Sequence, residues 1–280
     1  MTADLESRLV VVDLQTGRVL RHLRTLPLPR SIEAVGAAAV VAHPDLGAVS
    51  VVDTRRLEVV HVLRGLGEPR YTAGDPDGRH AYLTDAKRGE VVTVDVLRGR
   101  IVGRLEVGAR ARHISLDPTG RALWVALGPK AREIAVVDVA ARRLVRRFEP
   151  PFLAHDVGFA PDGRHAWVSS ADRFELAVYD ARSGRLRARP SGDWPPQHVT
   201  FGPDRAYVTS GWSGTLRVHR LDGRELLSNA VPVGSYNVQQ RDGFVVTPSL
   251  GHGELCVLDA AGRVVRRERI ARSSHDACVV

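Results

Sequence analysis

The sequence has only two cysteines and one methionine among its 280 residues. Cys256 and Cys278 are too few for a disulfide framework. Because no CxxC or CxxCH motif is present, a cysteine-based zinc site and covalently attached c-type haem are both disfavoured. Each cysteine lies in a strand-like stretch, so we expect two small, buried side chains.

Long apolar runs are also missing. The opening stretch MTADLESRLVVVDLQTG has no basic segment, and its apolar run covers only residues 9–12. Such a run is too short for the core of a signal sequence or for a membrane span. We therefore expect a soluble, cytoplasmic protein that makes no contact with a membrane.

Helical periodicity is absent as well. The apolar residues fall in short, valine-rich runs separated by turn residues, a pattern that favours strands. Hydrophobic residues make up 44% of the chain, with 26 glycines and 16 prolines. A chain of this composition can bury a core and make many turns.

One pattern recurs seven times along the chain: an apolar run ends in Asp, and a short turn with Gly or Arg follows. The runs end at Asp13, Asp53, Asp95, Asp138, Asp180, Arg220 (in the place of Asp) and Asp259. Successive copies are 39 to 43 residues apart, so seven copies fill the chain.

Each period contains four strand-like segments. In the copy at 75–116 these are residues 80–85, 90–95, 100–107 and 112–116. Turns such as DPDG and DPTG follow the last segment of a period, where Pro and Gly suit a type I turn. Four short antiparallel strands in about 40 residues are typical of a propeller blade. The sequence therefore predicts an all-β fold, with residues 1–280 forming one seven-bladed β-propeller domain.

The two ends of the chain predict how the ring closes. Residues 9–13 match the third strand of a blade, and residues 275–280 match an innermost strand. We expect one blade to combine both terminal strands. Its second strand is not evident, because residues 1–7 are short and polar.

Three segments carry a resemblance to a known family. HAYLTD (80–85), HAWVSS (165–170) and RAYVTS (205–210) resemble the YVTN-type propeller repeat, and the resemblance extends over nearly the whole chain. It implies the fold. Relatives with this repeat include surface-layer proteins, an amine dehydrogenase subunit, DNA-binding proteins and, more distantly, the haem d1-type propeller domain of a nitrite reductase, so the resemblance does not select a function.

The first strand of each blade should line the central channel, and its start is unusually polar. In one register the seven copies read Glu33, Tyr71, His113, Asp156, His198, Asn237 and Asp276. The preceding register reads Ile32, Arg70, Arg112, His155, Gln197, Tyr236 and His275. The YVTN repeat usually has a small residue in the first of these registers. The ring predicts a concave polar site, and the plainer alternative is a water-filled channel with a polar lining.

Our leading hypothesis is a small polar ligand or a metal ion bound at the mouth of the channel. The expected binding residues are Glu33, Arg70, Tyr71, Arg112, His113, His155, Asp156, His198, Tyr236, Asn237, His275 and Asp276. Imidazole and carboxylate groups are suitable ligands for zinc, iron, copper or manganese. The expected metal ligands are His113, His198 and Asp276.

The same groups could also carry out chemistry without a metal. A histidine beside a carboxylate titrates near neutrality and can move a proton. The candidates for catalysis are His113, His155, His198, His275 and Asp156. Haem, which only the resemblance to the nitrite reductase propeller suggests, is the less favoured cofactor, because that domain usually has eight blades.

The basic charge lies elsewhere. The net charge is +8, and arginines cluster in the last turn and outermost strand of each blade, for example at residues 142–147. Charge on an exposed edge strand prevents edge-to-edge pairing, so solubility is the plain explanation. The alternative hypothesis is an interaction scaffold with a protein partner, or a nucleic-acid-binding propeller that uses this rim. No aromatic residues interleave the basic ones to strengthen the nucleic-acid version.

Three further residues lie in loops that we expect at the same end as the polar ring: Trp194, Trp212 and His252. They are candidates for the rim of the binding site. By contrast, His80 and His165 occupy equivalent places at the opposite end of their blades, after DGR, and we expect them to be structural.

Overall fold

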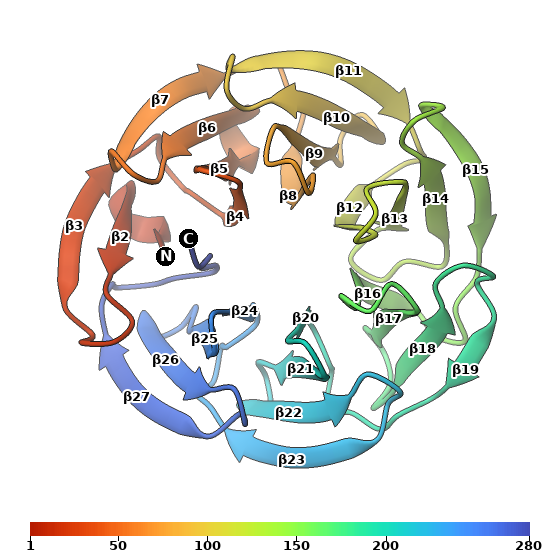
Figure 1. Cartoon of the computed structure of the whole chain (residues 1–280). Helices are drawn as coiled ribbons and strands as arrows, with labels where there is room; N and C mark the ends of the chain where they lie inside the picture. The colour runs from red at the N-terminus through yellow and green to blue at the C-terminus, as the bar shows by residue number, and fades with distance from the viewer.

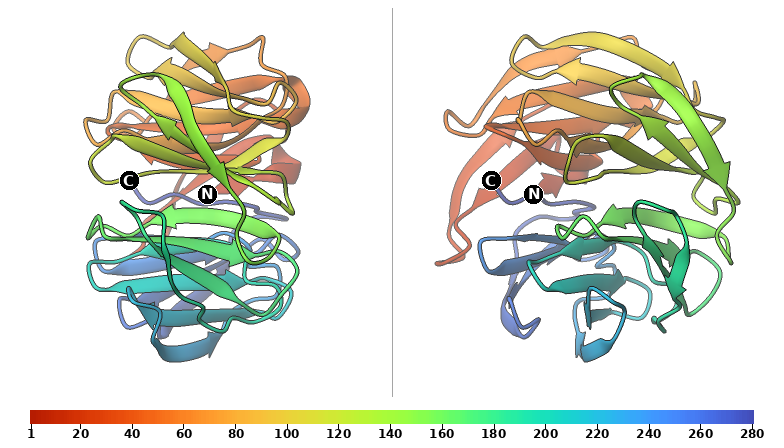
Figure 2. Two further views of the ribbon diagram at one scale, coloured as in Figure 1. Left: turned by 90° about the vertical axis from the view of Figure 1, so that its right-hand side faces the viewer. Right: turned by 45° about the vertical axis from the view of Figure 1, so that its right-hand side comes forward.

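The computed structural model describes all residues from Met1 to Val280 and consists of seven antiparallel sheets around a central axis (Figure 1). The body is a flattened ring when it is viewed from the side (Figure 2). The only helical segments are two 3-10 turns, Asp4–Glu6 and Pro44–Leu46, and no helix is long and apolar enough to cross a membrane. The predicted seven-bladed all-β propeller is confirmed.

Six sheets contain four strands each, and chain order within a sheet runs from the axis to the rim. The first strands are β4 (Ser31–Val35), β8 (Pro69–Gly74), β12 (Ala111–Leu116), β16 (Ala154–Phe159), β20 (Val199–Phe201) and β24 (Gln239–Arg241). The second strands are β5 (Ala38–His43), β9 (His80–Asp85), β13 (Ala122–Leu127), β17 (His165–Ser170), β21 (Arg205–Ser210) and β25 (Phe244–Pro248).

The third strands are β6 (Ala48–Asp53), β10 (Glu90–Asp95), β14 (Ile134–Asp138), β18 (Leu176–Asp180), β22 (Thr215–Arg220) and β26 (Glu254–Asp259). The fourth strands, on the rim, are β7 (Glu58–Leu63), β11 (Arg100–Glu106), β15 (Arg143–Phe148), β19 (Leu186–Ala188), β23 (Glu225–Ala230) and β27 (Val264–Arg269). The four segments predicted between residues 80 and 116 match β9 to β12 to within one residue at each end.

Position within a blade explains the composition of each strand. Middle strands such as β6 and β14 are buried on both faces because neighbouring blades pack against them, so they read as short continuous valine-rich runs. Rim strands such as β7 alternate exposed and half-buried residues. The arginine clusters therefore lie where each blade meets solvent.

The closing blade combines both ends of the chain, as predicted (Figure 1). Its strands β2 (Arg8–Val12) and β3 (Val19–Arg24) are preceded by β1 (Thr2–Ala3), the second strand that the sequence did not reveal. The innermost strand predicted for residues 275–280 is not formed as a regular strand, because the two-residue β1 offers little to pair with. Thr2 N still donates to the carbonyl oxygen of Asp276 at 2.8 Å.

An apolar cavity of about 510 Å³ lies beside this short pairing. Leu9 and Leu23 line it from the closing blade, Val246 and Leu255 from the last four-stranded blade, and Ala277 from the C-terminal segment. The ring is therefore less completely filled at its closure than elsewhere.

Candidate functional site

The central channel holds a cavity of about 250 Å³. Its lining includes every residue of the polar register identified in the sequence: Glu33, Tyr71, His113, Asp156, His198, Asn237 and Asp276. The preceding register lies toward one end of the channel, which we call the channel mouth. It contributes Arg70, Arg112, His155, Tyr236 and His275, none of which lines this cavity.

Local irregularities of the first strands bring the two registers together. In β8, β12 and β16 the pairing with the second strand shifts by one residue near the start of the strand. Such β-bulges re-aim side chains and are common beside functional sites. The bulged dipeptides are Arg70–Tyr71, Arg112–His113 and His155–Asp156. In β4 the pairing is regular, so Ile32 packs into an apolar cluster at the edge of the cavity and Glu33 is the charged residue that this strand contributes.

Hydroxyl groups on the second strands hold these bulges in place. Thr84 Oγ1 donates to the carbonyl oxygen of Arg112 in the following blade at 2.5 Å. Ser169 Oγ accepts from Asp156 N at 3.1 Å and donates to the Gln197 carbonyl. Thr84 and Ser169 belong to the segments HAYLTD (80–85) and HAWVSS (165–170), which resemble the YVTN repeat. Part of the repeat motif therefore fixes the backbone on which the variable polar residues stand.

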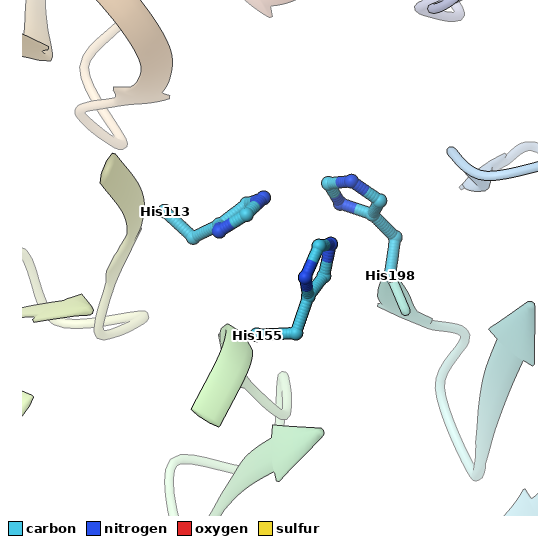
Figure 3. Close-up of side chains that lie close together, drawn as sticks. All are labelled: His113, His155 and His198. Carbon is cyan, nitrogen blue, oxygen red and sulfur yellow. The ribbon is translucent and has the colours of Figure 1, made fainter. Parts of the chain in front are cut away.

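Three imidazoles from three consecutive blades converge at the mouth side of the cavity (Figure 3). His113 extends from β12, His155 from β16, and His198 from the residue before β20. One ring nitrogen from each lies within 4.8 Å of the other two. We call these residues the three-histidine cluster.

Hydrogen bonds leave the cluster with unused nitrogen lone pairs. His155 Nδ1 lies 3.3 Å from the Pro129 carbonyl oxygen, and His198 Nδ1 lies 3.4 Å from Asp156 Oδ2. Each Nδ1 carries the proton if it donates to its oxygen, which leaves Nε2 as the acceptor. His198 Nε2 is buried and has no hydrogen-bond partner.

His113 is the least satisfied member of the cluster. It is fully buried, and neither of its ring nitrogens has a hydrogen-bond partner. Its ring stacks on that of Tyr71, with centroids 4.1 Å apart. A buried polar group without a partner costs about 1–3 kcal/mol, so a folded protein rarely keeps one without a reason.

Two members of the cluster, His113 and His155, have lowered pKa values. Burial lowers the pKa of His113 well below its usual value, and the neighbouring His155 and His198 lower it further. Burial, followed by the nearby His198, lowers the pKa of His155 to about 3. Neutral imidazole is the form that binds a metal ion, so protons do not compete for the nitrogens of His113 and His155 near pH 7.

Carboxyl groups occupy three further positions of the polar ring. Asp276, which we expected to join His113 and His198, lies outside the three-histidine cluster. Its two oxygens accept from Ile32 N at 3.1 Å and Ala277 N at 2.7 Å. His155 from the neighbouring register completes the cluster instead.

Glu33 is the second carboxyl group on this side, and it faces Gln239, whose Nε2 donates to it at 3.0 Å. Burial raises the pKa of Glu33 to about 7, with a further contribution from Asp156. Burial also raises the pKa of Asp276 well above its usual value, and Glu33 adds to this effect. The channel therefore combines two carboxyl groups with raised pKa values, Glu33 and Asp276, with histidines whose pKa values are lowered.

Glu33 should make stability depend on pH. Its ordinary pKa is 4.5 and its folded pKa is about 7, so between these values the folded chain keeps a proton that the unfolded chain releases. Stability conferred by the protonated form is lost as pH rises through this window. We expect Glu33→Gln to recover about 1–2 kcal/mol at pH 8 and nothing at pH 4, allowing for screening by water in the channel.

Urea denaturation of the metal-free protein at both pH values measures this difference. Glu58→Gln is the matched control, because Glu58 lies on the rim and its side chain is 48% exposed. An equal pH dependence in wild type and Glu33→Gln would contradict the assignment.

The remaining mouth residues surround the cluster. Arg70 pairs with Glu68, and His275 Nδ1 lies 3.0 Å from the Arg30 carbonyl oxygen. The ring of Tyr236 lies 6.4 Å from that of Trp212, measured between centroids. Arg112, whose guanidinium carbon is 5.6 Å from the Tyr71 ring centroid, forms no ion pair with a carboxylate.

The other residues predicted from the sequence lie outside the three-histidine cluster. The loop residues Trp194, Trp212 and His252 are exposed at the end where the mouth lies. His80 and His165 contact the aspartates of their own turns, Asp75 and Asp162, as expected for structural residues.

Many rim arginines pair with neighbouring carboxylates, including Arg104, Arg187, Arg189 and Arg263. This pairing leaves less free positive charge on the rim for contacts with phosphate groups.

Several residues of the site were not predicted from the sequence. Pro129 orients His155 through its carbonyl oxygen, and a backbone acceptor has no side-chain signature. Gln239 reaches Glu33 from a strand two blades away around the ring. Arg30 immediately precedes β4 and adds positive charge near His275. Comparing more of the residues that come before each first strand could have revealed it.

Comparison with known proteins identifies the fold only. No family model and no curated protein matches the sequence, so the YVTN resemblance is not confirmed by a family model. Many solved structures share the fold. One of them, described as Kuenenia stuttgartiensis Hydrazine Synthase, is similar with a TM-score of 0.75, covering 90% of this chain and 89% of that chain at 17% sequence identity.

Proposed function

We propose that this propeller binds one divalent transition-metal ion through His113, His155 and His198 and acts through it on a small molecule, as a metal-dependent enzyme. The observation that carries the proposal is the convergence of three imidazoles in which His113 is fully buried with both nitrogens unpartnered.

The surroundings of the cluster support this proposal. Metal-binding histidines usually donate their other ring N–H to a carboxylate or a backbone carbonyl, which fixes the tautomer and the ring orientation. The Pro129 carbonyl is hydrogen-bonded to His155 Nδ1, and Asp156 Oδ2 lies 3.4 Å from His198 Nδ1. Second-shell partners of both common kinds are therefore present.

The donor set limits the identity of the metal. Three imidazole nitrogens without thiolates suit zinc, copper, iron or nickel, and they do not suit magnesium or calcium, which prefer oxygen ligands. Three protein ligands also match catalytic rather than structural zinc sites, because a position is left for water or substrate. A metal held in this way supplies a Lewis acid.

Elemental analysis of untagged protein tests the proposal, because a polyhistidine tag would itself bind metal. We expect close to one equivalent of a transition metal per chain after reconstitution and desalting. The double variant His113→Ala/His198→Ala should retain almost none. The matched control is His80→Ala/His165→Ala, which removes two histidines from turns outside the channel and should retain the metal. Equal metal content in both double variants would overturn the proposal.

A second candidate function is docking of a protein partner at the end where the mouth lies. Phe174, Trp194 and Trp212 are 60%, 43% and 69% exposed there, and the first two rings lie 5.2 Å apart. Exposed aromatic groups of this kind are typical of interfaces. A stoichiometric partner that is retained by the histidine double variant and lost in Trp194→Ala/Trp212→Ala would support it, and retention by the tryptophan variant would contradict it.

A further inference from the structure

Arg112 lies at the channel mouth and has no carboxylate partner within the protein. It directly precedes His113 in the same β-bulge. Its Nε is buried and has no hydrogen-bond partner, although the guanidinium stands 5.6 Å from the ring centroid of Tyr71. A guanidinium group has five N–H donors in a planar fork that matches a planar anion.

Two further arginines increase the positive charge at this point. Burial lowers the pKa of Arg112, Tyr71 opposes this effect, and the nearby charges of Arg70 and Arg30 lower the pKa further. Arg70 is paired with Glu68, and Arg30 lies 3.7 Å from Asp4. Arg70 and Arg30 therefore each have a carboxylate partner, and Arg112 has none.

The metal site adds charge of the same sign. Three neutral imidazoles leave both positive charges of a divalent ion unbalanced, and Asp156 is the carboxylate nearest to the cluster, 3.4 Å from His198 Nδ1. Positive charges gathered in a partly buried site favour an anion there. An anion that spans the metal and Arg112 would satisfy both.

We infer that the small molecule on which the site acts is a small planar carboxylate, held between the guanidinium of Arg112 and the ion bound by the three-histidine cluster. This inference rests on the proposed metal site. The two carboxylate oxygens match the fork of Arg112 in a charge-assisted pair, and one of them can also reach the open position on the metal. The cavity of about 250 Å³ that adjoins the cluster is of a size for a small molecule.

Cobalt(II)-loaded full-length protein provides the test, because the visible spectrum of cobalt responds to its ligands. Formate and acetate are titrated into wild type, Arg112→Gln and Arg112→Lys in buffer without other carboxylates. We expect a saturable spectral change in wild type, with an apparent dissociation constant roughly 10- to 100-fold higher in Arg112→Gln. Arg112→Lys should fall between the two, because it keeps the charge and loses the planar fork.

Controls separate this inference from the proposed function. Arg112→Gln should bind cobalt at least as tightly as wild type, because it removes a like charge beside the ion. Arg88→Gln, in the exposed loop between β9 and β10, should bind the carboxylates like wild type. Failure of wild type to bind cobalt would overturn the metal site and this inference together. Three results would overturn the carboxylate site only, provided that cobalt binding is normal. They are no spectral response to formate or acetate, a response to phosphate alone, and equal carboxylate affinity in wild type and Arg112→Gln.

Discussion

The variant His113→Phe should make the metal-free protein more stable by about 1–2 kcal/mol while it removes metal binding. The phenyl ring can keep the stacking on Tyr71, whose centroid lies 4.1 Å from that of His113, and it eliminates two buried nitrogens that have no partner. Replacing an unsatisfied polar group by an apolar one recovers its desolvation cost. A residue that destabilises the fold in this way is typical of functional sites, where activity is kept at the expense of stability.

Two measurements on one variant test this expectation. Urea denaturation with a chelator present gives the free energy of unfolding, and zinc titration gives the affinity, which should fall by more than the 10- to 100-fold typical of losing an outer-shell partner. The control is His80→Phe, which breaks the contact with Asp75 at a turn and should leave zinc affinity unchanged. If His113→Phe destabilises the metal-free protein and still binds zinc like wild type, the role given to His113 is wrong.

Trp124→Ala should lower the free energy of unfolding by about 3–5 kcal/mol. Trp124 is 1% exposed and packs edge-on against Phe148, Phe159 and Tyr179, with centroid distances of 5.0, 5.2 and 5.8 Å. Phe159 and Tyr179 belong to the next blade. The indole therefore joins the blade that carries His113 to the blade that carries His155.

This position gives the substitution a second consequence. Because the relative placement of His113 and His155 depends on the contact between their blades, Trp124→Ala should also weaken zinc binding, and Trp124→Phe should weaken it less. Denaturant curves and zinc titrations on both variants measure the two effects. The control is Trp212→Ala, since that side chain is 69% exposed and should change stability by no more than about 0.5 kcal/mol. A loss of less than 1 kcal/mol in Trp124→Ala would contradict this account of blade packing.

The repeat made most of the fold predictable. A seven-fold pattern, with Asp at the end of six of the seven third strands and Pro-containing turns after four of the first strands, predicts the number of blades, the strands and the closure by both termini. Local turn chemistry carries this information, and local chemistry is readable in a sequence. The two-residue strand β1 was not predictable, because Thr2 and Ala3 are too few to form a recognisable strand pattern, although they pair with Leu9 and Arg8 close by in the chain.

The candidate site was predictable as a ring and less so as a cluster. The alternation of side chains along a strand predicts that Glu33, His113 and Asp276 face the channel, and the structure places them there. His155 stands one position earlier, in the register that strict alternation would turn away from the channel, although its polar side chain made it a candidate for binding. The β-bulge in β16 breaks this alternation, and its cause lies in contacts such as that of Ser169 with Asp156, which only the folded chain brings together.

X-ray absorption at the zinc edge of the reconstituted, untagged protein tests the central claim most directly. We predict one zinc ion per chain, a first shell of nitrogen and oxygen atoms at about 2.0–2.1 Å, and outer-shell scattering from three imidazole rings. Loss of one imidazole contribution in His155→Ala would identify the member of the cluster that strand alternation alone did not predict. A first shell that contains sulfur, fewer than three imidazoles in the wild type, or no retained zinc would contradict the account.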